Sequence, residues 1–276
     1  MNASFRPSAH AESPSVRFEE IPTQHGLRLG FAQLNAEKSL NALAHDMIRL
    51  LDPQLRRWAA DPEIACVILH GAGDKAFCAG GDLQLQADGT PFTIDAADPR
   101  HYVAALFRRM DSCRLPLIAR VNGPALAGGF GLMCACDLVV ARDDAKLGTT
   151  EVKVGIFPMM ILPYLLRVVS YRRVMELCIT GELITGKDGE AENIVNYAVP
   201  AAELDEKLDW LLSRITDKSP TGIRLGKQAL SKIREMSTDS ALEYAQFMLA
   251  NMSRTKDARE GMVAFNEKRS PNWTAE

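Results

Sequence analysis

Two glycine-rich turns, each directly after a short apolar strand, constrain the fold of this chain more than any other feature. The first turn spans residues 76–82 and follows the apolar stretch 66–70; the second spans 122–131 and follows 116–121. Glycine has no side chain, so its backbone N–H can approach a ligand closely. If the fold brings the turns together, two N–H groups can point at one carbonyl oxygen. That arrangement is an oxyanion hole, which suits an enolate or a tetrahedral intermediate.

Short strands and helices alternate through the first half of the chain. The pattern predicts strands at 16–21, 27–34, 64–70, 116–121 and 137–141. It predicts helices between them, at about 41–60, 100–113 and 128–135. Asn41 is the expected N-cap of the first helix, because asparagine side chains accept hydrogen bonds from a helix start. Alternation with short connections favours an α/β core with parallel pairing and right-handed crossovers.

Composition divides the chain into three parts. Residues 1–14 are polar and predict a disordered lead, whereas 15–200 carry the α/β core. After Val199-Pro200 only helical spacing continues, so 201–276 is expected to form a C-terminal helical region. Within the core, residues 84–100 are rich in Asp, Gly, Pro and Thr and predict a mobile loop.

Charge and cysteine usage exclude several classes of protein. The net charge is −3, so no basic excess attracts nucleic acid. The six cysteines lie mostly in apolar segments and lack zinc-ligand spacing, which predicts no metal, no disulfides and a reducing compartment. No stretch resembles a signal peptide or reaches transmembrane length. We therefore expect a cytoplasmic protein with no membrane partner.

Five stretches of the sequence carry a family resemblance. Each glycine motif alone is weak evidence, but five in order and at matching spacing are strong. The stretches are 34–43, 76–82, 122–129, Cys136-Asp137 and 260–269. In them the chain resembles the enoyl-CoA hydratase/isomerase family, also called the crotonase superfamily, over residues 16–273.

The resemblance implies a fold and a type of substrate. The implied fold is a crotonase-like α/β spiral of ββα units, as in the ClpP/crotonase group, closed by C-terminal helices. The implied substrate is an acyl-coenzyme A thioester, with coenzyme A belonging to the substrate and no separate cofactor. Family members assemble as homotrimers or dimers of trimers, in which residues 201–276 would serve trimerisation and cover coenzyme A.

The resemblance also implies roles for individual residues. Gly81 and Gly128 match the two oxyanion donors. The positions that match coenzyme A contacts or border them are Lys38, Cys78, Ala79, Gly80, Asp82, Met159, Phe265 and Lys268. In relatives, the residues that match Phe265 and Lys268 reach coenzyme A, often from a neighbouring subunit. Read without the resemblance, Lys38 is equally well a solvated lysine, Phe265 a core residue and Asp82 a cap of the turn.

Family hydratases use two glutamates, and only one is present here. The first maps onto Gly131, which has no proton to transfer; the second maps onto Glu151. The apolar stretch after Glu151 is expected to raise the pKa of its carboxyl towards that of a working acid/base. Met159 stands where hydratases carry glycine, and the run 159–162 predicts a dry acyl pocket. Candidates to replace the missing carboxylate are Asp82, Asp88 and Glu176.

These residues leave several functions open. A single carboxylate beside an oxyanion hole suffices to move a proton between two carbons, which favours double-bond isomerisation of an enoyl-CoA. Family membership alone favours hydration, so the expected enzyme is a lyase or an isomerase. The alternatives are thioester hydrolysis, another reaction at the same hole, or acyl-CoA binding without catalysis.

Overall fold

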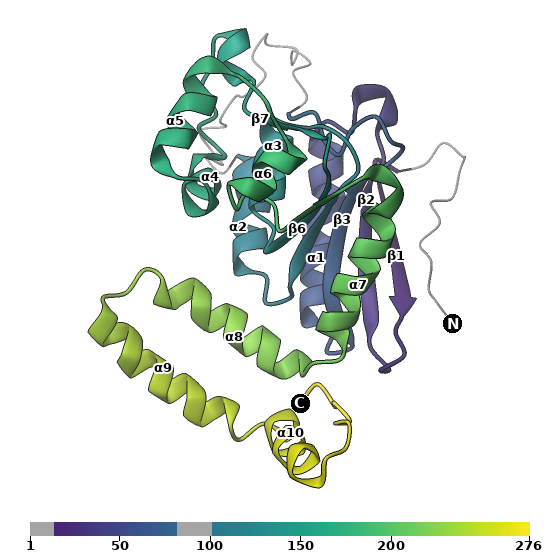
Figure 1. The fold of residues 1–276 in the computed structure, drawn as a ribbon, viewed down its shortest axis with the longest axis vertical. Coiled ribbons are helices and arrows are strands. Elements are labelled where there is room, and N and C mark those ends of the chain that lie inside the picture. Colours follow the sequence, from purple (N-terminus) through teal and green to yellow (C-terminus); the bar gives the residue numbers. More distant parts are fainter. Residues whose placement is uncertain (1–13, 82–100) are drawn as a thin grey trace.

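A six-stranded sheet forms the centre of the protein (Figure 1). The computed structural model describes residues 14–81 and 101–276. The strands, in sheet order, are β1 (Val16–Pro22), β2 (Arg28–Leu34), β3 (Ile64–Gly71), β4 (Leu117–Val121), β6 (Leu138–Arg142) and β9 (Tyr197–Val199). β1 pairs with β2 in an antiparallel hairpin, and the remaining neighbours are parallel. The predicted hairpin and parallel core are confirmed; β9 was not predicted.

Helices cover both faces of this sheet, as a parallel sheet requires. On β3, Val67 and Leu69 pack towards α1 and α2, whereas Cys66 and Ile68 pack towards α7 on the other face. The helices are α1 (His45–Ala60), α2 (Tyr102–Ser112), α3 (Gly128–Cys134), α4 (Leu162–Val168), α5 (Tyr171–Thr180), α6 (Gly186–Ala191), α7 (Leu204–Thr216), α8 (Pro220–Ile233), α9 (Thr238–Met252) and α10 (Lys256–Glu267). Each predicted helix exists in the described part of the chain, with its ends shifted by a few residues.

A second, three-stranded sheet holds the second glycine turn. Its strands, in sheet order, are β5 (Ala125–Leu126), β7 (Lys146–Gly148) and β8 (Ile184–Thr185). These strands are too short to give a periodic sequence signal, which is why β5 and β8 were not predicted. Because β5 directly precedes α3, the sheet fixes where that helix begins. Short 3-10 turns complete the order: η1 (Glu37–Ser39), η2 (Glu151–Val154) and η3 (Ala201–Glu203).

The last three helices extend away from the sheet. Figure 1 shows α8, α9 and α10 at one end of the molecule and α3 to α6 at the other. In this chain α9 has no buried residue. α7, which also lies in the predicted C-terminal region, instead packs onto the sheet through Leu208 and Leu212. None of the helices in the described ranges combines the length and apolar character that crossing a membrane requires.

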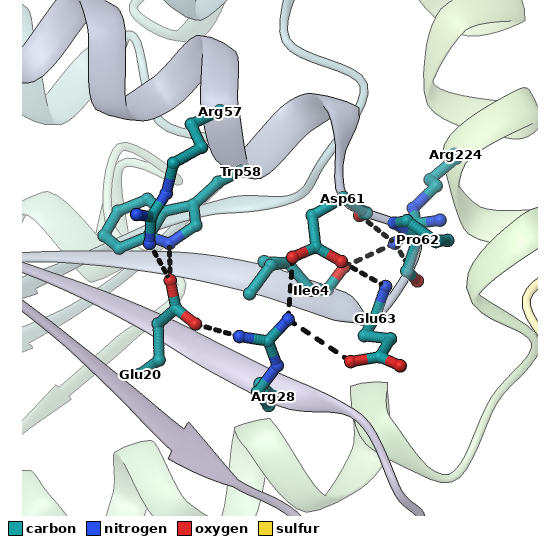
Figure 2. Close-up of polar contacts among 9 residues, drawn as sticks. All are labelled: Glu20, Arg28, Arg57, Trp58, Asp61, Pro62, Glu63, Ile64 and Arg224. Atoms are coloured by element: carbon teal, nitrogen blue, oxygen red, sulfur yellow. Dashed lines mark hydrogen bonds and ion pairs between the residues drawn. The ribbon is translucent and has the colours of Figure 1, made fainter.

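One buried arginine attaches α8 to the core (Figure 2). Arg224 is only 6% exposed, and its Nη2 donates to the carbonyl oxygens of Asp61 (3.3 Å), Pro62 (2.7 Å) and Ile64 (2.5 Å). The same loop is held from the other side, where Arg28 Nη2 donates to Asp61 Oδ2 at 2.7 Å. The loop between α1 and β3 is thus one docking point of α8 on the core.

Replacing Arg224 by methionine is expected to lower the free energy of unfolding by about 2 kcal/mol. The substitution removes the charged donor from three carbonyl oxygens, of which that of Ile64 is buried, and hydrogen bonds to charged groups contribute about 1.5–3 kcal/mol each. Urea unfolding measures the loss. Arg49→Met, at an exposed position of α1, is the control and should change stability by less than about 0.5 kcal/mol. Equal stability of the two variants would contradict the anchoring role.

The predicted capping role of Asn41 is wrong. α1 begins at His45, its N-cap residue is Ala44, and no side chain caps it. Asn41 is fully buried in a left-handed conformation (φ 57°), which asparagine tolerates better than most residues. Its Nδ2 donates to the carbonyl oxygens of Ala72 (3.1 Å) and Ala76 (2.8 Å). The amide is therefore used to satisfy buried backbone at the start of the first glycine turn.

Candidate active site

The two glycine turns lie against each other. The Leu126 N–H donates to the Cys78 carbonyl oxygen at 2.9 Å, and the Phe77 N–H donates to Pro124 O at 3.0 Å. Gly129 makes this contact possible, because a Cβ placed there would lie 2.1 Å from Cys78 O. The turns, far apart in sequence, thus form one continuous backbone surface.

Gly81 and Gly128 meet at the centre of this surface. A Cβ on Gly128 would lie 3.3 Å from the Gly81 backbone nitrogen. Gly128 is the first residue of α3, where N–H groups have no acceptor within the helix. Within 14–81 and 101–276, neither the Gly81 nor the Gly128 N–H donates to a protein group. Two adjacent N–H groups that remain available for a ligand are what an oxyanion hole requires.

The residues before these donors have positive φ. Gly80 has φ 111°, and the Ala127 Cβ would lie 2.8 Å from a Cβ placed on it, so this position accepts only glycine. Ala127 itself has φ 49°, a strained value for a residue with a side chain. Its N–H donates to Gly148 O at 2.9 Å, which ties the second turn to β7. The small sheet therefore holds the strained turn in place.

Glu151 presents a carboxyl group to the same site. It begins η2, three residues after β7, and its Oε2 atom is buried without a hydrogen-bond partner in the described part of the chain. Burial raises the pKa of the Glu151 carboxyl above its ordinary value of 4.5, while backbone N–H groups of Glu151 and Thr150 oppose the shift. A buried carboxyl with an unused oxygen and a raised pKa suits proton transfer.

A cavity of about 410 Å³ connects these groups. Of the predicted site residues, it brings together Ala79, Gly81, Gly128, Glu151 and Met159. Its remaining lining residues are mainly apolar: Leu43, His101, Val103, Ala127, Thr150, Lys153, Val154, Ile156, Phe157, Pro158, Met160 and Ile161. This lining agrees with the dry pocket expected from the run 159–162.

Other predicted contact residues do not line the cavity. Cys78 is buried behind the turn, where burial raises the pKa of its thiol to about 12. Lys38 is exposed in η1. Phe265 is 84% exposed and, like Lys268, belongs to the end of α10, far from α3 in Figure 1. A single chain therefore does not bring the α10 residues to the cavity.

Some predicted positions cannot be placed at the site. Asp82 and Asp88, like the expected loop 84–100, lie outside the described residues. Glu176, the third candidate to replace the missing carboxylate, is exposed and does not line the cavity. Its Oε2 atom pairs with Arg173 Nη1 at 2.5 Å. Its engagement on α5 gives no support for a role in catalysis.

Gly131 has no room for a side chain. A Cβ placed on it would lie 2.1 Å from Ile161 Cγ2 and 3.4 Å from Phe107 Cζ. Ile161 therefore fills the space that a side chain at position 131 would occupy. The apolar run 159–162 predicted an apolar cavity wall, but no sequence signal indicates that residue 161 packs against residue 131.

His101 borders the cavity as well. Its Nδ1 accepts a hydrogen bond from the Val103 N–H at 3.3 Å and so caps the start of α2. Its ring also stacks on Tyr102 at 4.4 Å between centroids. Burial lowers the pKa of its imidazole, which favours the neutral form. The structure shows a capping role for this residue.

Comparison with known proteins relates this chain to one family. The family model described as enoyl-CoA hydratase/isomerase matches residues 29–276. A short-chain-enoyl-CoA hydratase of Clostridium acetobutylicum is 30% identical over 243 residues, covering 88% of this chain and 92% of that protein. A crotonyl-CoA hydratase of Syntrophomonas wolfei is 30% identical over 265 residues, covering 94% and 99%.

Solved structures show the same fold. A crystal structure of enoyl-CoA hydratase from Bacillus anthracis matches with a TM-score of 0.84 at 31% identity, over 95% of this chain and all of that one. A Mycobacterium smegmatis enoyl-CoA hydratase matches with the same TM-score at 29% identity. The protein has the crotonase fold and belongs to the enoyl-CoA hydratase/isomerase family.

Proposed function

We propose that this protein moves the double bond of an enoyl-CoA thioester, using Glu151 as its single proton-transferring carboxylate. The observation that carries the proposal is the unpartnered, buried Oε2 of Glu151 in the same cavity as the available N–H groups of Gly81 and Gly128. A carboxylate oxygen that is buried without a hydrogen-bond partner, as Glu151 Oε2 is, costs folding free energy, so a role in chemistry explains its position better than a structural role.

Each part of the site has one task in this mechanism. The thioester carbonyl oxygen accepts hydrogen bonds from the Gly81 and Gly128 N–H groups, which stabilise the negative charge of the enolate. Glu151 removes a proton from the carbon next to the carbonyl of a 3-enoyl-CoA and returns it to the γ-carbon. The product is the 2-enoyl-CoA, and the carboxylate is regenerated.

The surroundings favour this reaction over hydration. Hydration needs an ordered water molecule at the site, and a water is held reproducibly only by two or more polar groups. Gly131 supplies no second carboxylate, and the cavity wall at Phe157, Pro158 and Met160 is apolar. The absence of a polar seat at these positions supports proton transfer between carbons.

The proposal includes the partners of the protein. The ligand is an acyl-CoA thioester, held in part by Lys38 and, from a neighbouring subunit, by Phe265 and Lys268. Assembly as a homotrimer or a dimer of trimers in the cytoplasm completes the proposal. The exposed apolar side chains of α9, Leu242 (60%), Phe247 (72%) and Leu249 (68%), support assembly, since such surface is normally covered.

Incubation with a 3-enoyl-CoA in D₂O tests the reaction. The absorbance of the conjugated 2-enoyl thioester should report migration of the double bond, and mass spectrometry should show no added water. Deuterium enters the product where the proton on Glu151 exchanges with solvent before it is returned. A product heavier by one water would favour hydration, and release of free coenzyme A would favour hydrolysis. An unchanged but tightly bound substrate would identify a binder and contradict the proposal.

The pH dependence follows from the raised pKa of Glu151. The carboxyl removes a proton only when ionised, so kcat/KM is expected to rise with pH through the folded-state pKa. Because burial raises that pKa, the midpoint of the acid limb should lie above 4.5. A pH–rate profile with a non-sticky substrate measures it. A rate that is independent of pH down to 4.5 would contradict the assigned base.

A further inference from the structure

Gly131 and Ile161 interlock between α3 and α4. The Ile161 Cγ2 and Cβ atoms would lie 2.1 and 2.5 Å from a Cβ on Gly131, so the isoleucine occupies the volume of that missing side chain. Ile161 is 2% exposed. Phe107, whose Cζ would lie 3.4 Å from the same Cβ, is equally buried and stacks on Tyr164 at 4.8 Å between ring centroids. Ile161, Phe107 and Tyr164 belong to one buried apolar cluster, and a close-packed interior leaves the isoleucine little space in which to move away.

This side chain lies beside the oxyanion hole. Gly131 follows the donor Gly128 by three residues in α3, and residues three apart share one face of a helix. Ile161 therefore fills the face of α3 that continues from the Gly128 donor, and it borders the cavity together with Glu151. The wall next to it, Phe157 and Pro158, offers no polar side chain to hold water.

We propose that Ile161 is a specificity-determining residue that keeps water away from the β-carbon of the bound thioester. The inference rests on the proposed function. In the competing reaction, the oxygen of water bonds to the β-carbon of the 2-enoyl product. One proton of that water passes to the Glu151 carboxylate, and the Glu151 carboxyl group delivers a proton to the α-carbon. With the isoleucine in place the enolate gains only a proton, on carbon, and the product leaves unhydrated.

Truncation of Ile161 tests this role. Wild type, Ile161→Ala and Leu165→Ala are compared for two rates: deuterium exchange with a 3-enoyl-CoA in D₂O, and water addition to a 2-enoyl-CoA. Leu165→Ala is the matched control, because it removes the same number of carbons from a buried α4 residue that does not line the cavity. Thermal unfolding checks that each variant folds.

The ratio of hydration to exchange is the decisive quantity. In Ile161→Ala it should rise by about tenfold or more, the scale on which methylene groups in a pocket alter selectivity. In Leu165→Ala it should stay at the wild-type value. Ile161→Val, which keeps most of the volume and the fold, should give a smaller rise in the same direction.

The possible failures are distinguishable. An unchanged ratio in both Ile161→Ala and Ile161→Val, with exchange intact, overturns the role of Ile161 alone. Wild-type hydration that is faster than exchange also overturns it. Wild type that neither exchanges deuterium nor moves the double bond overturns the proposed function and, with it, this inference.

Discussion

Replacing Glu151 by glutamine is expected to lower kcat for double-bond migration by about 10²–10⁴-fold, the usual contribution of a general acid/base. Glutamine keeps the shape of the side chain but accepts no proton at neutral pH. Acyl-CoA binding should persist, because the Gly81 and Gly128 donors are unchanged. Steady-state kinetics and calorimetric titration with a saturated acyl-CoA measure the two effects separately.

The stability of Glu151→Gln separates a catalytic role from a structural one. Burial raises the pKa of Glu151, so the native state binds its proton more tightly than the unfolded state does. The stabilising effect of that proton is fully present below 4.5 and is lost as pH rises through the folded-state pKa. At pH 7 the glutamine variant should therefore unfold no more easily than wild type.

Two outcomes would contradict this expectation. The matched control is Glu182→Gln, at an exposed position, which should keep wild-type kcat. Equal turnover of the Glu151 and Glu182 variants would remove Glu151 from the mechanism. A Glu151 variant that is clearly less stable than wild type would make the carboxylate structural.

Substituting alanine for Gly129 is expected to damage both stability and activity. The added Cβ would lie 2.1 Å from Cys78 O and 2.7 Å from Cys78 C, and these are backbone atoms that cannot rotate away. The two glycine turns must separate, which we expect to cost about 3 kcal/mol or more of unfolding free energy. Separation also displaces the N–H groups of Gly81 and Gly128, the proposed oxyanion donors, and a misplacement of about 1 Å typically costs about 10²-fold in rate.

Gly226→Ala is the control for the effect of alanine on a helix. Gly226 lies within α8, and a Cβ there would meet nothing within 4 Å. Alanine should raise stability at this position by up to about 1 kcal/mol through its higher helix propensity. Chemical unfolding measures the stability of both variants, and steady-state kinetics measures their kcat/KM. A Gly129→Ala enzyme with wild-type stability and rate would show that the turns are not tightly joined.

The regular elements of the core could be predicted because they follow local patterns. β3 and β4 are apolar runs of strand length, and α1 repeats Met47, Leu51, Leu55 and Trp58 at helical spacing. The glycine turns were found for the same reason, since glycine marks positions where backbone must approach closely.

What the sequence did not reveal depends on contacts between distant residues. Asn41 has a capping side chain, but the buried carbonyls of Ala72 and Ala76 attract its amide instead. The resemblance identified Gly131 as the position where family hydratases carry a carboxylate. That Ile161 fills the space beside Gly131 follows only from the packing of α3 against α4. Packing partners of this kind have no fixed sequence spacing.

Deuterium exchange into a saturated acyl-CoA is the most direct test of the central claim, because this ligand can neither isomerise nor be hydrated. Formation of an enolate in the Gly81–Gly128 hole by Glu151 predicts exchange of the α-protons in D₂O with wild type and none above background with Glu151→Gln. A wild-type enzyme that binds the thioester but exchanges no α-proton would contradict enolate chemistry at this site.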